Sequence, residues 1–202
     1  MTYRAEHVRA ATPEDGAACA AIYAPYVTTT AISFESEPPG PEEMAQRIAA
    51  AAVGHAWLVL VAPRDAQVGG GDGGDGGEGD AGPAGAAGGE VVGYAYAGPY
   101  QTRAAYRWSC SVGIYVAQRR RGGGAGRVLY ASLLQRLEER GYRMAVAAIT
   151  LPNEASLGLH RALGFEPIGT SHHIGWKHGA WHDVAWLQRP LGAGADPPAE
   201  PR

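Results

Sequence analysis

Cysteine is scarce in this chain, and long apolar runs are absent. Cys19 and Cys110 are the only cysteines among 202 residues, and their wide separation fits neither a CxxC motif nor a disulfide framework. The net charge of -3 gives no broad cationic surface for nucleic acid. The segment from Met1 to Ala11 lacks the apolar core of a signal peptide, and no later stretch is long enough to span a bilayer. We therefore expect a cytoplasmic protein with two reduced thiols that binds neither nucleic acid nor a membrane.

The length and the apolar content predict one domain over residues 1–190. Hydrophobic residues make up 46% of the chain, which is enough for the core of an ordinary domain. Residues 69–89 contain only Gly, Asp, Glu, Ala and Pro, whose side chains are too small or too polar to offset the entropy of ordering the segment. We therefore predict a disordered insertion at about residues 67–89. The Pro-, Gly- and Ala-rich tail, residues 191–202, is also predicted to be disordered.

Helix and strand signals are interleaved along the chain. Capping residues, first-turn prolines and leucines at helical spacing predict helices at residues 13–25, 41–53, 127–140 and 153–163. Dense apolar runs predict strands at residues 3–9, 57–61, 91–97, 108–116, 144–150, 167–173 and 181–188. This order favours the α/β or α+β class, with helices flanking one mixed, mostly antiparallel sheet.

A basic, glycine-rich run at residues 119–126 joins a predicted strand to a predicted helix. The free amides at the start of a helix and the positive end of its dipole favour an anion at this point. Glycines let the backbone approach a diphosphate, and arginines add charge. The run lacks the Lys and Ser/Thr of a nucleoside-triphosphate P-loop and the opening βαβ context of a dinucleotide fold. The sequence therefore predicts a diphosphate site of another kind.

Residues 121–126, with the sequence RGGGAG, match the R/Q-x-x-G-x-G/A element of GNAT acetyltransferases. Further blocks occur in the same order, at residues 94–99, 114–116, 151–153, 159–165 and 177–184. Together they resemble the phosphinothricin-acetyltransferase type of that family, over nearly the whole chain except the insertion and the tail. The resemblance implies a single GNAT-like acyl-CoA N-acyltransferase domain. It also implies a homodimer that moves acetyl from acetyl-CoA to the amine of a small amino-acid-like acceptor, such as phosphinothricin or methionine sulfoximine.

The resemblance also implies where acetyl-CoA binds. The strand backbone at Ile114, Tyr115 and Val116 pairs with the pantetheine arm, and the backbone at Tyr115 is expected to donate to the oxyanion. The diphosphate is expected at Arg121, Gly122, Gly123, Gly124, Ala125, Gly126 and Arg127. Asn153 is expected both to contact the cofactor and to cap a helix. No metal is expected, because the spacing of the histidines near the C-terminus fits no compact zinc pattern.

Acetyl transfer needs a neutral amine, oxyanion stabilisation and a proton for the departing thiolate. A gap-free alignment places Ser111 where the family has a glutamate base. A serine hydroxyl is a poor base, although it can hold a water that relays the proton. His160, matched to a family histidine near the reaction centre, is the first alternative base, and Glu35 is the second. Tyr130 matches a tyrosine that protonates the thiolate, although His160 and Tyr130 could also be core residues.

The acceptor site is expected to be lined by Phe34, Arg103 and Tyr106. An arginine can hold a carboxylate or phosphinate by two hydrogen bonds. Gln101 replaces a lysine of the family, which weakens the case for doubly anionic acceptors such as phosphinothricin. The rival interpretation is a catalytically impaired acyl-CoA-binding protein, and Ser111 is the feature that favours it.

Overall fold

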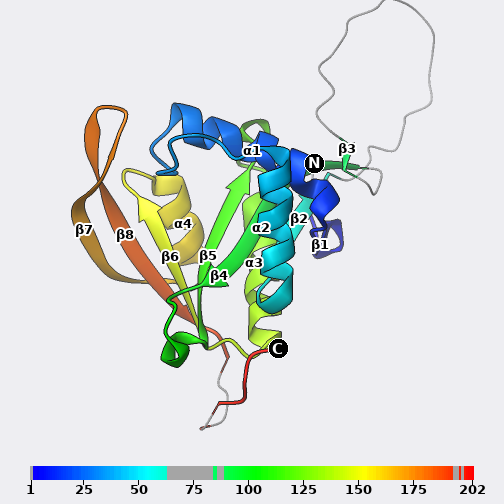
Figure 1. Ribbon diagram of the computed structural model, residues 1–202, viewed down its shortest axis with the longest axis vertical. Helices are drawn as coiled ribbons and strands as arrows, with labels where there is room; N and C mark the ends of the chain where they lie inside the picture. The colour runs from blue at the N-terminus through cyan, green and yellow to red at the C-terminus, as the bar shows by residue number, and fades with distance from the viewer. Residues whose placement is uncertain (1, 63–83, 86–88, 193–195, 197) are drawn as a thin grey trace, which may run out of the picture.

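The structure is a computed structural model that describes residues 2–62, 84–85, 89–192, 196 and 198–202 (Figure 1). Most of the predicted insertion at 67–89 lies outside these residues. The helices are α1 (Gly16–Thr29), α2 (Pro41–Gly54), α3 (Ala125–Glu139) and α4 (Glu154–Ala162). The strands are β1 (Val8–Ala10), β2 (Trp57–Val61), β3 (Ala84–Gly85), β4 (Gly89–Pro99), β5 (Ser109–Val116), β6 (Met144–Thr150), β7 (Glu166–Lys177) and β8 (Ala180–Pro190).

Within the described residues the strands form one sheet in the order β1-β2-β4-β5-β6-β8-β7, with β3 paired to β4. The β5–β6 pair is parallel and the other neighbours are antiparallel. This arrangement confirms the predicted mixed, mostly antiparallel sheet. No helix of the described residues has the length and apolar character needed to cross a membrane.

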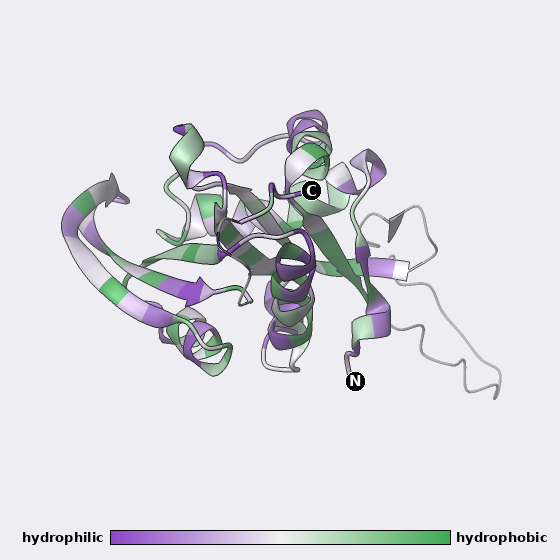
Figure 2. Ribbon diagram, turned by 90° about the horizontal axis from the view of Figure 1, so that it is seen from below, coloured by the Kyte–Doolittle hydropathy of each residue, from purple (hydrophilic) through white to green (hydrophobic). Residues whose placement is uncertain are grey.

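The helices cover the two faces of the sheet and bury its alternating side chains. Tyr94 and Val59 point to the face that packs on α1 and α2. Ala95 and Cys110 point to the other face, which packs on α3 and on Leu157 of α4. This alternation is the period-2 pattern of strands with both faces covered. Figure 2 shows the apolar strands enclosed between the helices.

The parallel strands β5 and β6 separate after three residues. Their register runs only from Ser109 opposite Met144 to Ser111 opposite Val146. Beyond Ser111, β5 continues to Val116 paired only with β4, while β6 continues to Thr150 paired only with β8. The two strands therefore diverge towards their C-terminal ends, on the side of the sheet where α3 starts (Figure 1). This divergence leaves an opening between two central strands.

Two predicted elements differ from the observed ones. The strand predicted at 3–9 is a short 3-10 helix, Ala5–His7, followed by β1, and the backbone N–H of Arg4 donates to His7 Nδ1 at 3.0 Å. The first helix does not end at Pro25 but continues to Thr29. Buried Tyr26 and Val27 pack this last turn on the sheet, so tertiary packing outweighs the hydrogen bond that proline removes.

The last residues of the chain contact the domain. Trp108 Nε1 donates to the carbonyl of Ala199 at 2.8 Å, and Arg107 forms an ion pair with Glu200 at 2.7 Å. The backbone N–H of Arg202 donates to the carbonyl of Arg140 at 2.9 Å. Residues 198–202 therefore differ from the expected disordered tail, while residues 193–195 and 197 lie outside the described part of the chain.

Candidate functional site

The opening between β5 and β6 contains a cleft of about 230 Å³. Six of the residues predicted to bind acetyl-CoA line it: Ile114, Val116, Arg121, Gly122, Gly126 and Asn153. Six more residues, which were not among the predicted site residues, complete the lining: Tyr26, Ile32, Arg120, Ala155, Ser156 and Leu159. The cleft thus brings together the end of α1, the edge of β5 and the starts of α3 and α4.

The glycine-rich run forms the start of α3 through two left-handed residues. Gly122 and Gly124 have φ values of 81° and 80°, a conformation that favours glycine, and Gly124 is the N-cap. The first helical hydrogen bond is from Val128 to the carbonyl of Gly124 at 3.2 Å. The amides of Ala125, Gly126 and Arg127 therefore have no partner within the helix and can bind an anion.

The three arginines before this helix have different surroundings. Arg119 and Arg120 both form ion pairs with Glu90, the latter at 2.8 Å. Arg121 forms no ion pair within the described residues, and its guanidinium stacks 4.9 Å from the ring centroid of Tyr26. Arg121 thus brings the positive charge that is available to a diphosphate in the cleft.

The backbone of β5 presents alternate residues to the opening. The N–H of Ala117 donates to Val92 of β4, whereas the carbonyl of Trp108 accepts from Met144 of β6. Because backbone groups alternate along a strand, those of Val112, Ile114 and Val116 point towards β6 and those of Tyr115 point towards β4. The prediction that Tyr115 donates to the oxyanion was therefore wrong.

The hydroxyl group of Tyr26 occupies one end of this strand edge. It lies 3.2 Å from the nitrogen and 2.5 Å from the carbonyl oxygen of Val116. The N–H of Val116 is therefore engaged, and the N–H of Ile114 is the donor that remains for a substrate in the opening. Sequence periodicity carries no signal for this contact, because Tyr26 and Val116 are 90 residues apart.

Tyr130 and His160 form a buried pair beside the cleft. The Tyr130 hydroxyl lies 3.0 Å from His160 Nε2, and His160 Nδ1 lies 2.8 Å from the carbonyl oxygen of Ser156. Burial lowers the pKa of His160 and raises that of Tyr130 well above its ordinary value. The neutral imidazole therefore donates from Nδ1 to Ser156 and accepts at Nε2 from Tyr130. In this arrangement His160 has no lone pair left for an amine.

The pair is part of the core under the sheet. Tyr130 is 0% exposed and His160 is 4% exposed, and both rings pack on Phe165 at centroid distances of 5.9 and 4.9 Å. Neither residue lines the cleft, although Ser156 and Leu159 of the same helix do. The structure therefore brings the two predicted catalytic residues together, one helix turn from the cleft wall.

Replacing Tyr130 by phenylalanine should lower the free energy of unfolding by about 1–3 kcal/mol, because it leaves the buried Nε2 of His160 without a donor. The comparison is urea denaturation of wild type and variant at neutral pH. Tyr142→Phe is the matched control, since its hydroxyl donates to Gly54 at 2.7 Å in a less buried setting and should cost less. Equal stability of wild type and Tyr130→Phe would contradict the assigned hydrogen bond.

Ser111 lies on the opposite face of β5, towards α1 and α2. It is half-buried and pairs in register with Gly98 of β4. Strand alternation places Ser111 on the same face as Gly113 and Tyr115. The Ser111 hydroxyl makes no hydrogen bond to any of the residues that the structure describes. This face therefore carries a small polar group where the resemblance implies a glutamate.

The three predicted acceptor residues fall into two groups. Phe34 packs against Gly175 of β7 and lies 6.2 Å from the ring of His182. Arg103 and Tyr106 belong to the 3-10 turn between β4 and β5, where Tyr106 packs on Tyr100. Phe34 and Tyr106 are among the exposed large apolar side chains, and Arg103 is also exposed. These side chains are accessible to a small molecule from outside the core.

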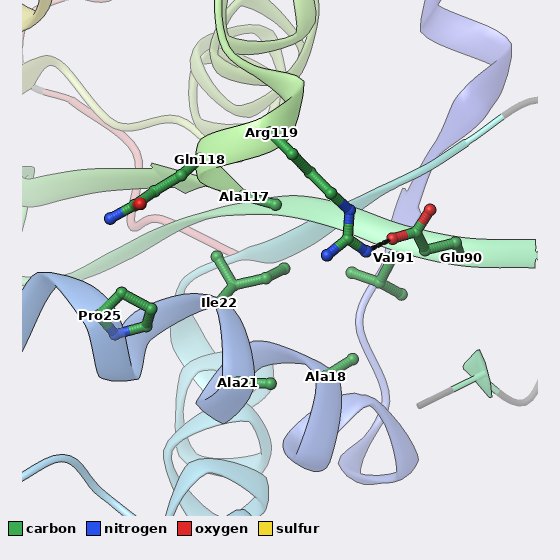
Figure 3. A pocket seen from close by; sticks show the side chains of 9 residues that line it. All are labelled: Ala18, Ala21, Ile22, Pro25, Glu90, Val91, Ala117, Gln118 and Arg119. Atoms are coloured by element: carbon green, nitrogen blue, oxygen red, sulfur yellow. Dashed lines mark hydrogen bonds and ion pairs between the residues drawn. The ribbon is translucent and has the colours of Figure 1, made fainter. Parts of the chain in front are cut away.

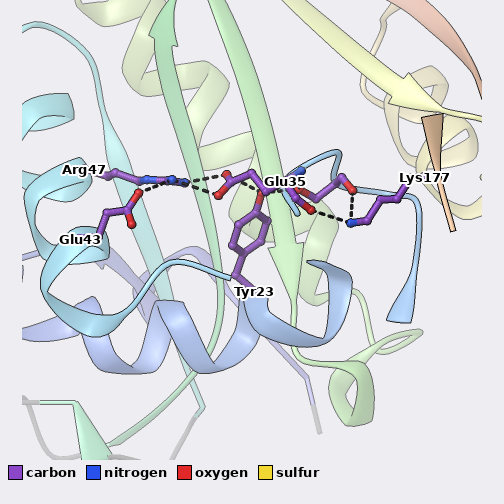
Figure 4. A network of polar contacts seen from close by, with 6 residues as sticks. Tyr23, Glu35, Glu43, Arg47 and Lys177 are labelled. Carbon is purple, nitrogen blue, oxygen red and sulfur yellow. Dashed lines mark hydrogen bonds and ion pairs between the residues drawn. The ribbon is translucent and has the colours of Figure 1, made fainter. Parts of the chain in front are cut away.

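A polar network that sequence reasoning missed fixes the loop containing Phe34 (Figure 4). Arg47 of α2 binds both carboxylate oxygens of Glu35, at 2.8 and 3.0 Å. The hydroxyl of Tyr23 donates to Glu35 at 2.9 Å and lies 2.6 Å from Ser33 Oγ. Lys177 Nζ donates to the carbonyls of Val27, Ser33 and Glu35 at 2.6, 2.7 and 2.8 Å. The network thus ties the loop to α1, α2 and the β7–β8 hairpin.

A second cavity of about 270 Å³ lies between α1, the start of β4 and residues 117–119, which follow β5 (Figure 3). Its apolar walls include Ile22, Pro25 and Val91, and the ion pair of Arg119 and Glu90 lies at one side. None of the predicted site residues lines it. Within the described residues, no group of three or more His, Cys, Asp or Glu is arranged to hold a metal ion.

Comparisons with known proteins agree on one family. The sequence model described as the acetyltransferase (GNAT) family matches residues 76–165. The chain is 36% identical to a phosphinothricin N-acetyltransferase of Streptomyces viridochromogenes, over 98% of this chain and 93% of that one. It is 40% identical over 100 residues, 50% of this chain and 58% of the other, to an L-methionine sulfoximine/L-methionine sulfone acetyltransferase of Pseudomonas aeruginosa. A phosphinothricin acetyltransferase structure from Sinorhizobium meliloti in complex with acetyl-CoA superposes with a TM-score of 0.80 at 32% identity, covering 100% of this chain and 94% of that one.

Proposed function

Because the chain belongs to the GNAT acetyltransferase family, we propose that it moves the acetyl group of acetyl-CoA to the amino group of a small amino-acid-like acceptor. The observation that carries the proposal is the cleft between the diverging strands β5 and β6, beside the glycine-rich start of α3. The relative from Streptomyces viridochromogenes and the structure from Sinorhizobium meliloti are similar over nearly the whole chain and are named phosphinothricin acetyltransferases, and that structure contains acetyl-CoA.

The residues of the cleft fit acetyl-CoA as a substrate. The amides at the start of α3 and the guanidinium of Arg121 suit a diphosphate. The exposed strand edge at Ile114 suits an amide of the pantetheine arm, since it offers a donor and an acceptor in the plane of the sheet. Asn153 has its side chain committed to Ser156 N at 3.2 Å, as the predicted helix cap, and it also borders the cleft.

Three groups of this chain are proposed to act on the reacting atoms. The N–H of Ile114 would stabilise the oxyanion that forms as the amine attacks the thioester carbonyl. Tyr130 would supply a proton to the departing thiolate once its hydroxyl turns from His160 towards the cleft. Ser111 would hold a water next to the attacking amine. The role of Tyr130 is supported by its position, since the Tyr130–His160 pair adjoins the cleft wall. The role of Ser111 is supported by its hydroxyl, which has no hydrogen-bond partner among the described residues.

For the acceptor we propose an amino acid whose side chain carries little or no negative charge, of the methionine sulfoximine kind. Arg103 is one exposed cation in the turn between β4 and β5, and Gln101 stands two residues before it. One guanidinium can hold a single carboxylate by two hydrogen bonds. Phosphinothricin carries a second anionic group, and the uncharged Gln101 offers no cation to pair with it.

We also propose that the protein is a cytoplasmic homodimer. Four exposed apolar side chains lie on the β7–β8 hairpin: Ile168, Ile174, Trp176 and Trp181. Trp176 and Trp181 are 60% and 57% exposed, and patches of this kind mark protein interfaces. The cytoplasmic location is supported by two free, buried cysteines, whose burial raises the pKa of each thiol to about 12.

Two measurements test the proposed reaction against the rival acyl-CoA-binding protein, which the serine at position 111 favours. Calorimetry with acetyl-CoA reports binding, which both functions require. Mass spectrometry of an acceptor incubated with acetyl-CoA and protein reports transfer, which only the enzyme performs. We expect binding and an N-acetylated product, whereas binding without product would support the rival.

A further inference from the structure

The acceptor face of β5 has no carboxylate of its own, so another group must accept the proton of the amine. His160 is excluded from direct contact, since both of its ring nitrogens are engaged within the core. Tyr23, Tyr96 and Tyr115 lie on the correct face, but burial raises the pKa of each phenol, so all three stay protonated at neutral pH. A base must therefore come from an element that packs over this face.

Glu35 is placed over this face by a short chain of contacts. Its carboxylate accepts from the Tyr23 hydroxyl at 2.9 Å, and the Tyr23 ring lies 4.7 Å from the ring of Tyr115. Tyr115 is on the same face as Gly113 and Ser111, two and four residues away along the strand. Figure 4 shows Glu35 between Arg47 and Lys177, in front of the paired strands.

Glu35 is also held in position and charged. Arg47 binds both of its oxygens, which holds the pKa of the carboxyl below its ordinary value, so the group is ionised at neutral pH. Lys177 fixes the backbone of the same residue through its carbonyl. The Glu35 side chain is nevertheless 34% exposed, so its carboxylate is accessible to a water.

We propose that Glu35 is the general base of the transfer and replaces the acid that Ser111 lacks, an inference that rests on the proposed function. The neutral amine forms its bond to the thioester carbon, and the carbonyl electrons move to the oxygen. The nitrogen is then strongly acidic and loses a proton, through water, to Glu35. Collapse of the oxyanion breaks the C–S bond, the thiolate takes a proton from Tyr130, which solvent replaces, and Glu35 returns its own proton to solvent.

The first test is Glu35→Gln, which keeps the size of the side chain and an acceptor for Tyr23 but loses one of the two hydrogen bonds from Arg47, because an amide nitrogen cannot accept. We expect kcat/KM for the acceptor to fall by about a hundredfold, the usual scale for a positioned base, with an unchanged Kd for acetyl-CoA. The matched control is Glu43→Gln, which removes the other carboxylate of Arg47, at 2.6 Å, and should change kcat/KM by less than about threefold. Glu35→Gln within threefold of wild type would overturn the inference.

The second test separates a base from a residue that only shapes the loop. In the Glu35→Gln background, Ser111→Glu puts a carboxylate at the family position. It should raise kcat/KM for the acceptor at least about tenfold above that of Glu35→Gln alone. A double variant no faster than Glu35→Gln would overturn the inference, because damage to the loop is not repaired from β5. Wild-type protein that binds acetyl-CoA without turnover on any acceptor would overturn the proposed function and the inference together. Active wild type with unaffected Glu35→Gln overturns only the inference.

Discussion

Replacing Gly126 by aspartate should weaken acetyl-CoA binding by at least about a hundredfold while the protein stays folded. Gly126 is in the first turn of α3 and lines the cleft. A carboxylate at about 5 Å from a phosphate repels it by roughly 3 kcal/mol at an effective dielectric constant of about 20, and each 1.4 kcal/mol is tenfold in Kd. An aspartate in the first helical turn also interacts favourably with the helix dipole, so folding is not impaired.

The matched control is Gly126→Ala. A methyl group at this position would lie 3.5 Å from Leu159 Cδ2 and 3.8 Å from Ile114 Cδ1, which are ordinary contacts. We expect its Kd for acetyl-CoA, measured by calorimetry, to stay within about threefold of wild type. An aspartate variant that binds as tightly as the alanine variant would show that the diphosphate does not bind at the start of α3.

Replacing Lys177 by methionine should lower the free energy of unfolding by about 3 kcal/mol or more and raise the acceptor KM. Lys177 is the only lysine in the chain and is 9% exposed. Its ammonium donates to three carbonyls of the segment Val27–Glu35. Methionine fills the same space but has no hydrogen-bond donor. Each of these buried carbonyls is then left without a partner, which costs about 1–3 kcal/mol of folding free energy. Because this segment carries Phe34, the acceptor site should loosen while acetyl-CoA binding changes little.

The measurements are urea denaturation and steady-state kinetics with both substrates varied. His178→Ala is the matched control, because His178 Nε2 lies 3.2 Å from the carbonyl oxygen of Thr30, in the same loop, but is exposed. That variant should lose less than about 1 kcal/mol. Unchanged stability and unchanged acceptor KM in Lys177→Met would contradict the role of the lysine in holding the loop.

Local patterns in the sequence predict much of the fold. The predicted strands at 57–61 and 144–150 have the bounds of β2 and β6. Asn153 caps α4 as expected, and Gly164 follows that helix with a φ of 81°. These features depend on neighbouring residues, through strand periodicity, capping and left-handed glycine. Pro25 shows the limit, since the helix continues past it for tertiary reasons.

The candidate site is predictable only in part. The glycine loop is contiguous, so its residues can be recognised together. The Glu35–Arg47–Lys177 network joins three separate segments, and the contact of Lys177 with Val27 spans 150 residues. The orientation of Tyr115 depends on which neighbour its backbone faces, which requires the register of β4 and β5. Such features follow from strand order and long-range packing, which one sequence does not display.

Acetyl transfer to the amine of a small amino acid releases CoA, so CoA release is the decisive measurement. Wild-type protein is given acetyl-CoA alone and with each of several amino acids, including methionine sulfoximine and phosphinothricin, and the released thiol and the acetylated product are measured. We expect CoA release that depends on the acceptor, an N-acetylated product, and a higher kcat/KM for methionine sulfoximine than for phosphinothricin. Tight binding of acetyl-CoA without release on any acceptor would contradict this expectation.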